Sequence, residues 1–150
     1  MEKLQIHTAL QIARSRNDIF EAIVNPEKMS NYFIARGSGR MEEGNVVTWS
    51  FPEFPDSFPV KVKKVTAFEK VIFEWEGQEG SNLQVEISLE DRGNDHTLVR
   101  VTEGEMEADA KGIKWLAQNT EGWANFLACL KAYMEYDINL RKGGFDFMKK

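Results

Sequence analysis

Apolar residues in the last third of the chain recur at steps of three and four, the spacing of an amphipathic helix. At about 1.5 Å per residue, a helix over residues 112–140 is roughly 40 Å long and could cross a whole sheet. Gly122 costs about 1 kcal/mol relative to alanine inside a helix, so its presence predicts that another element packs closely there. The predicted apolar stripe contains Leu116, Thr120, Trp123, Leu127, Leu130 and Met134, and is widened by Ile113, Ala117, Ala124 and Ile138.

The first part of the chain predicts one strand followed by two short helices. Residues 3–13 alternate between apolar and polar positions, as in a half-buried strand. Ser15 can cap a helix that runs at apolar helical spacing as far as Asn25. Asn25 is a good N-cap and is followed by proline, a residue favoured in the first helical turn. We therefore expect a second short helix over residues 26–33.

Between residues 37 and 103 the apolar period changes from 3.6 to 2 and predicts about six strands. Residues 91–95 have the composition of a hairpin turn. The apolar face of such a meander needs a cover, and the helix over residues 112–140 has the matching length. The predicted inward-facing residues are Val47, Trp49, Phe51, Val60, Val62, Val71, Phe73, Trp75, Leu83, Val85, Ile87 and Leu89.

Length and charge narrow the class of protein. The 150 residues suit one domain over residues 1–150, and the formal net charge of -5 disfavours nucleic acid as a partner. The lysines of residues 61–70 have no interleaved stacking aromatics. Cys129 is the single cysteine, which excludes an intrachain disulfide and fits a reducing compartment. With no apolar run of membrane-spanning length and no leader-like N-terminus, we expect a cytoplasmic protein without a membrane span.

Four motifs together resemble a known superfamily. They are AIVNPEKMSNYF, VIFEWEG, LVRVTEGEM and NTEGWANFLACLKAYMEYDINLR, and they span nearly the whole chain. Their order and spacing are similar to those of the START/Bet v 1-like helix-grip superfamily (SRPBCC). Within it, the chain resembles the group named for the C-terminal domain of the activator of the heat-shock protein 90 ATPase.

The resemblance implies an α+β helix-grip fold. In that fold a curved antiparallel sheet of about six to seven strands wraps a long C-terminal helix, two short helices follow strand 1, and a cavity commonly lies between sheet and helix. The implied function is non-catalytic binding of a small hydrophobic, aromatic or lipid-like ligand, with a role in stress responses. One alternative is a module with a chaperone partner, as the family name suggests. A cyclase- or aromatase-like enzyme is a further alternative.

Recognisable catalytic, metal and cofactor motifs are absent from the sequence. It has no HExxH, CxxC, GxSxG, P-loop or dinucleotide fingerprint. His7 is expected on an outer strand face and His96 beside a turn, so the two histidines should not share a metal site. We therefore expect no metal, no cofactor and no catalysis.

Glu103 is the polar residue whose position needs explanation. It follows Thr97, Val99 and Val101 in parity, so its side chain should point toward the helix. A carboxylate in an apolar cavity would have a raised pKa and could hydrogen-bond a ligand or act as an acid. The favoured alternative is that the strand ends at a cavity mouth, where Glu103 is wet.

Large aromatic residues are expected to face inward together and to leave gaps suited to a flat apolar ligand, although a filled core is the competing interpretation. The Phe- and Pro-rich stretch 51–59 is expected to fold back as a plug, with a lid or a partner-binding tip as alternatives. The candidate ligand-binding residues are Phe33, Trp49, Phe51, Phe73, Trp75, Glu103, Leu116, Trp123, Leu127 and Met134.

Overall fold

The computed structural model describes residues 2–149 and has the predicted α+β helix-grip architecture. The elements in chain order are β1 (Lys3–Ile12), α1 (Arg16–Val24), α2 (Pro26–Met29), β2 (Arg36–Gly37), β3 (Val46–Ser50), β4 (Ser57–Thr66), β5 (Lys70–Gln78), β6 (Ser81–Gly93), β7 (His96–Glu107), α3 (Ala110–Tyr136) and a 3-10 turn (Asp146–Met148).

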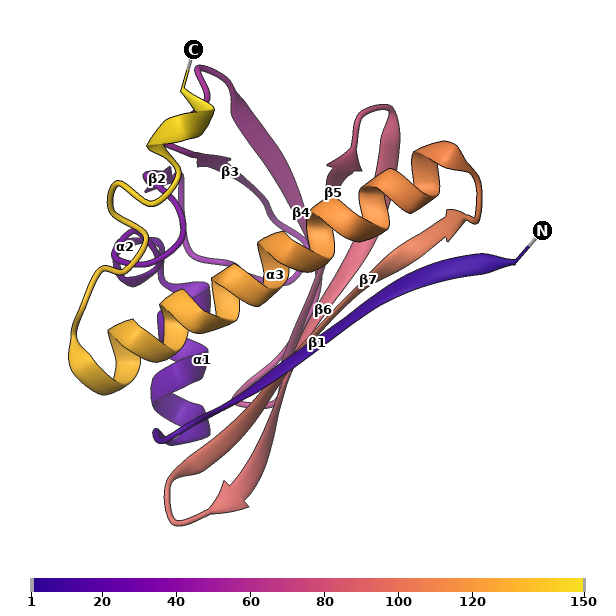
Figure 1. Cartoon of the computed structure of the whole chain (residues 1–150). Coiled ribbons are helices and arrows are strands. Elements are labelled where there is room, and N and C mark those ends of the chain that lie inside the picture. Colours follow the sequence, from indigo (N-terminus) through magenta and orange to yellow (C-terminus); the bar gives the residue numbers. More distant parts are fainter. Residues whose placement is uncertain (1, 150) are drawn as a thin grey trace.

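Within residues 2–149, seven strands form one antiparallel sheet in the order β1-β7-β6-β5-β4-β3-β2. The long helix α3 lies diagonally across one face of this sheet, and α1 and α2 close one end (Figure 1). The two edge strands, β1 and β2, are therefore separated by the full width of the sheet. This confirms the predicted meander and the predicted cover.

Side-chain caps explain where the helices begin and end. The Ser15 hydroxyl accepts from the Asp18 N–H at the start of α1, and Asn25 caps α2, as the sequence predicts. Helix α3 starts and ends earlier than the predicted residues 112–140. The Asp109 carboxylate caps Gly112 N–H, so the helix begins at Ala110, and Asp137 adopts a left-handed conformation (φ 54°) that ends it at Tyr136. The second helix is also shorter than predicted and ends at Met29.

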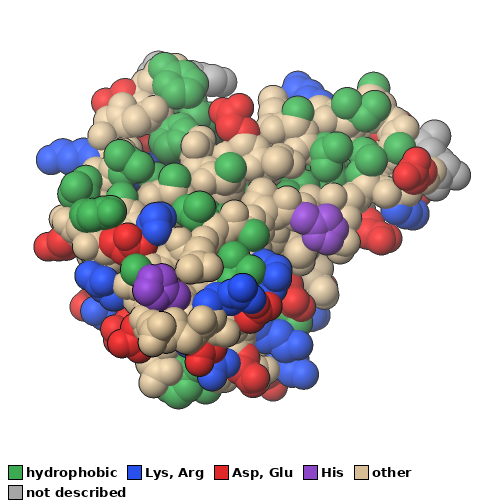
Figure 2. Space-filling model, turned by 60° about the horizontal axis from the view of Figure 1, so that its bottom comes forward, with side chains coloured by type: hydrophobic (Ala, Val, Ile, Leu, Met, Phe, Trp, Pro, Cys, Tyr) green, Lys and Arg blue, Asp and Glu red, His purple; other side chains and the backbone are tan. Residues whose placement is uncertain are grey.

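The core lies between the sheet and α3, and the predicted alternation of the strands is confirmed. Val60, Phe73 and Val85 are fully buried, while their neighbours in sequence are more exposed. Exposed charges of both signs are interspersed on the face shown in Figure 2, so this face carries no extended basic patch. No helix within residues 2–149 is both long enough and apolar enough to span a membrane.

The sheet forks between β4 and β5. These two strands pair from Thr66↔Lys70 as far as Lys61↔Glu74. Beyond that point β4 continues to pair with β3, up to Ser50↔Ser57, and β5 continues to pair with β6, up to Gln78↔Ser81. Residues 57–60 and 75–78 therefore diverge, and the sheet opens between them.

The chain after α3 turns back toward the fork. Residues 137–149, here called the strap, leave the end of α3, pass α2 and run toward β2 and β3 (Figure 1). The strap is built from local turns that include Gly143, whose φ of +75° suits glycine. Its residues Arg141, Phe145 and Met148 line the same pocket as Phe58 of β4 and Trp75 of β5.

Candidate functional site

A cavity of about 360 Å³ lies where the sheet forks, between α3, the loop after β3 and the strap. The interior is therefore not filled throughout. Four of the predicted residues line it: Phe33, Phe51, Trp75 and Trp123. The sequence interpretation missed other lining residues, among them Tyr32, Glu53, Phe54, Phe58, Asn119, Gly122, Asn125, Phe126, Cys129, Arg141, Phe145 and Met148.

The walls of the cavity are mainly aromatic rings that support one another. The ring centroids of Trp75 and Trp123 lie 5.5 Å apart, and that of Phe126 lies 5.2 Å from that of Trp123. Phe33 packs edge-on against Phe51 and Phe126, at centroid distances of 5.3 and 4.8 Å. These separations and tilts are typical of stabilising aromatic pairs, so the rings hold one another in place around the cavity.

Other predicted site residues belong to the core instead. Trp49, Phe73 and Leu127 are buried beneath the cavity wall, and Leu116 and Met134 are partly buried against the core. They do not line the cavity. The reason is that the space does not run along the middle of the helix–sheet interface, where side chains fill the gap. It is displaced toward the fork and the strap.

The face that α3 presents to the cavity is offset from the predicted stripe. Asn119, Gly122, Phe126 and Cys129 line the cavity at helical spacing. The predicted widening of the stripe was wrong, because its members are exposed: Ile113, Ala117, Ala124 and Ile138.

The interpretation of Gly122 was also wrong. A Cβ placed on this glycine would meet no atom within 4 Å, so no neighbouring element requires glycine here. The missing side chain instead leaves open space in the cavity wall.

The wet position favoured for Glu103 was wrong: its side chain is fully buried. β7 continues past Glu103 to Glu107 with β1 on one side and β6 on the other, so Glu103 does not lie at a strand end. Its carboxylate accepts hydrogen bonds from Trp75 Nε1 at 2.5 Å, Asn119 Nδ2 at 3.0 Å and Trp123 Nε1 at 3.2 Å. All three donors line the cavity, whereas Glu103 itself does not.

Gly77 makes room for this arrangement. A Cβ at Gly77 would collide with the Glu103 carboxylate and lie 3.0 Å from Leu83 Cδ1. Asn119 Nδ2 also donates to the Gly77 carbonyl oxygen at 2.8 Å, which ties β5 to α3. Glycine at this position therefore allows β5, β7 and α3 to meet around one buried carboxylate.

An ion pair closes the other end of the cavity. Arg141 of the strap donates two hydrogen bonds to Glu53 of the loop after β3, at 2.8 and 3.1 Å. Only 4% of the Glu53 side chain and 15% of the Arg141 side chain are exposed. The guanidinium also lies over the rings of Phe51 and Phe145, 5.5 and 4.7 Å from their centroids. The strap is thus fastened to the loop by a partly desolvated bidentate pair.

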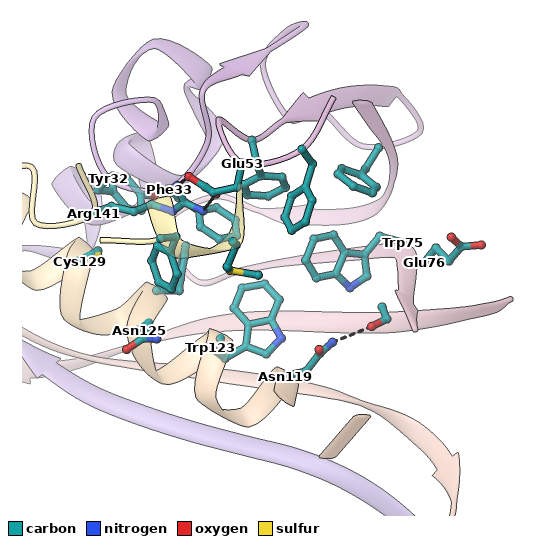
Figure 3. A pocket seen from close by; sticks show the side chains of 18 residues that line it. Tyr32, Phe33, Glu53, Trp75, Glu76, Asn119, Trp123, Asn125, Cys129 and Arg141 are labelled. Atoms are coloured by element: carbon teal, nitrogen blue, oxygen red, sulfur yellow. Dashed lines mark hydrogen bonds and ion pairs between the residues drawn. The ribbon is translucent and has the colours of Figure 1, made fainter. Parts of the chain in front are cut away.

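The 51–59 stretch forms part of the cavity wall. Phe51, Phe54 and Phe58 all line the space, and Phe54 is 41% exposed. Figure 3 shows Glu53 and Arg141 together at one end of the cavity and Trp75 with Asn119 at the other. The stretch therefore lies at the position expected of a lid or a plug, against the strap.

Burial raises the pKa of two side chains at the cavity. It raises the pKa of the Tyr32 phenol well above its usual value, with a further contribution from Tyr133, and the hydroxyl donates to the Ala22 carbonyl oxygen at 2.9 Å. Burial also raises the pKa of the Cys129 thiol, partly opposed by the charge of Arg141. Both groups are thus kept neutral at physiological pH, and neither has the activated character of a nucleophile or a base.

The described residues contain no candidate metal centre. Between residues 2 and 149, the His, Cys, Asp and Glu side chains form no group of three or more that could hold a metal ion. His7 is exposed on β1, and the His96 ring contacts the Asn94 carbonyl oxygen beside the β6–β7 turn.

Comparison with known families decides the classification. The family model described as activator of Hsp90 ATPase homolog 1-like protein (AHSA1) matches residues 13–135. The chain belongs to this family. The AHSA1-like family lies within the Bet v 1-like helix-grip superfamily, as the motifs predicted. No curated protein sequence matches the chain.

Solved structures support the same fold. Protein SSP2350 from Staphylococcus saprophyticus is 29% identical, with a TM-score of 0.79 over 92% of this chain and 96% of its own. The Aha1 dimer from Colwellia psychrerythraea is 22% identical, with a TM-score of 0.74 over 89% of this chain and 97% of its own. DynU16, a putative protein in the dynemicin biosynthetic locus, is 21% identical, with a TM-score of 0.79 over 89% of this chain and 48% of its own.

Proposed function

We propose that this AHSA1-like chain acts as one domain that binds a small hydrophobic, aromatic ligand in the cavity without transforming it. The observation that carries the proposal is a cavity of about 360 Å³ walled by aromatic rings from α3, β5, the loop after β3 and the strap. Ligand pockets typically measure about 300–1,000 Å³ and combine apolar walls with few polar groups. The single cysteine, Cys129, is free, so the proposal includes a reducing compartment such as the cytoplasm.

The engagement of the main charged groups near the cavity supports a role without catalysis. Glu53 and Arg141 bind each other, and Glu103 accepts from three donors behind the wall. A general acid or base must come within hydrogen-bond reach of the substrate. Glu103 does not line the cavity, so it serves this proposal as a structural carboxylate and not as a catalyst.

Gly122→Leu provides a direct test, because its side chain would occupy open space in the cavity wall. We expect the variant to fold with unchanged or slightly raised stability, since replacing glycine inside a helix stabilises it by up to about 1 kcal/mol. We also expect at least a tenfold loss of affinity for apolar aromatic compounds. Titration followed by tryptophan fluorescence and by NMR shifts at Trp75 and Trp123 measures the loss.

Ala124→Leu is the matched control. Ala124 is exposed and lies two residues away on α3, so the same side chain there should leave binding unchanged. Native mass spectrometry of gently purified protein should show a co-purified small molecule in the parent protein and not in Gly122→Leu. If a library of flat apolar compounds shifts no cavity resonance of the parent protein, the ligand-binding proposal fails.

A chaperone-associated role is the second candidate, favoured by the family description, which names an activator of the Hsp90 ATPase. We expect that adding this chain to the chaperone leaves ATP turnover unchanged. A saturable rise in turnover that persists in Gly122→Leu would favour the chaperone role, because that effect would not depend on the cavity.

A further inference from the structure

The two ends of the cavity differ in how their charges are compensated. At the strap end, the Glu53 carboxylate is paired with Arg141, whose guanidinium lies over two phenylalanine rings. At the fork end, the buried Glu103 carboxylate lies behind Trp75 and Trp123. Within residues 2–149, no Lys, Arg or His nitrogen forms a salt bridge with Glu103.

The Glu103 carboxylate is surrounded by donors. It accepts hydrogen bonds from two indole N–H groups and one amide. A carboxylate without a cationic partner creates a negative potential around it, and low local polarity strengthens this potential. Trp75, Trp123 and Asn119, which donate to this carboxylate, all line the cavity.

The two indole rings contact both the Glu103 carboxylate and the cavity. Both N–H groups donate to Glu103, so the two indole rings line the cavity while their donors are engaged elsewhere. Tryptophan faces are the best aromatic hosts for cations, which bind within about 6 Å of the ring centroid. The position of Arg141 over Phe51 and Phe145 shows that aromatic rings of this cavity can hold a cation in this protein.

An anionic ligand would find less favourable partners. Arg141 is the cationic residue that lines the cavity, and both of its terminal nitrogens donate to Glu53. A carboxylate ligand such as a fatty acid would have to displace Glu53, which is itself buried.

We infer that the ligand carries a positive charge on its apolar or aromatic body, and that Glu103 selects for this charge as a positioning residue behind Trp75 and Trp123. This inference rests on the proposed ligand-binding function. It narrows the ligand class to arylalkyl ammonium and quaternary ammonium compounds, with the cation over the indole rings at the fork.

Three probes of nearly equal shape test the inference on the unmodified protein. They are (2-naphthylmethyl)trimethylammonium, its neutral carbon isostere 2-neopentylnaphthalene and the anion 2-naphthylacetate. We expect the cation to bind about tenfold more tightly than the neutral isostere, and the anion to bind most weakly. Dissociation constants from calorimetry, with NMR shifts to locate the site, give these ratios without any substitution.

Two substitutions then assign the preference to a residue. Glu103→Gln keeps the side-chain shape and one acceptor but removes the charge, so the cation should lose most of its advantage while the neutral isostere changes by less than about twofold. Glu105→Gln is the control: Glu105 lies two residues further along β7 with its side chain exposed, and it does not line the cavity. That control should leave the ratio unchanged.

The possible results distinguish a wrong ligand charge from a failure of the proposed ligand binding. If the neutral isostere binds as tightly as the cation in the unmodified protein, the inference is wrong while ligand binding stands. If Glu103→Gln leaves the preference as large as Glu105→Gln does, the selecting charge lies elsewhere and the role given to Glu103 is overturned. If no probe shifts a cavity resonance, both the inference and the ligand-binding function fail.

Discussion

Glu103→Leu is expected to lower the free energy of unfolding by about 3–5 kcal/mol, which is a large effect for a single substitution. Leucine has a similar volume but accepts no hydrogen bond. The change would leave the N–H groups of Trp75 and Trp123 without their acceptor and would remove one of the two acceptors of Asn119 Nδ2. Each unsatisfied buried donor costs about 1–3 kcal/mol. Urea denaturation followed by circular dichroism measures the loss.

Glu105→Leu is the matched control for this prediction. Glu105 lies two residues further along β7 with its side chain exposed, so its replacement should change stability by less than about 0.5 kcal/mol. Equal effects of the two substitutions would contradict the role of Glu103 as the shared acceptor at the centre of the fold.

Glu53→Gln is expected to release the strap and to raise the rate at which Cys129 reacts with a thiol reagent by at least about tenfold. The substitution removes the charge that Arg141 pairs with and leaves a partly buried guanidinium that gains by turning to solvent. Cys129 lines the cavity beneath this closure and is 5% exposed, so its reaction requires the strap to move. Because it is the single cysteine, labelling followed by mass spectrometry reports one site.

Asp56→Asn, in the same loop, removes an exposed charge and should leave the labelling rate unchanged. Circular dichroism should show that Glu53→Gln keeps its native secondary structure, so that faster labelling reports local opening. A labelling rate in Glu53→Gln equal to that of the parent protein would show that other contacts hold the strap in place.

The fold could be predicted from the sequence because period and capping are local signals. Strict alternation over residues 83–89 fixes which face of β6 is buried, and Ser15 and Asn25 mark helix starts by their side-chain chemistry. These signals depend on near neighbours in the chain. The family motifs then supplied the order in which the elements pack.

The site was harder to predict because it depends on where the elements diverge. Nothing in the alternation of β4 and β5 indicates that their pairing stops at Lys61↔Glu74. The strap has no long apolar period, so the contribution of Arg141 and Phe145 to the cavity had no sequence signal. Gly122 did carry a signal, but glycine in a helix indicates either close packing or open space, and only the neighbours in three dimensions decide between them.

The fork also has a mechanical consequence. Ladder hydrogen bonds hold paired strands about 4.8 Å apart, but residues 57–60 of β4 and 75–78 of β5 are not constrained in this way. The sheet therefore behaves as two blades, one of β2–β4 and one of β5–β7 with β1, joined along the pairs from Lys61↔Glu74 to Thr66↔Lys70. We expect a small change in the angle between the blades to widen the cavity without breaking any β4–β5 hydrogen bond. If the cavity binds ligands as proposed, this backbone flexibility would let the same side chains accept ligands of different width.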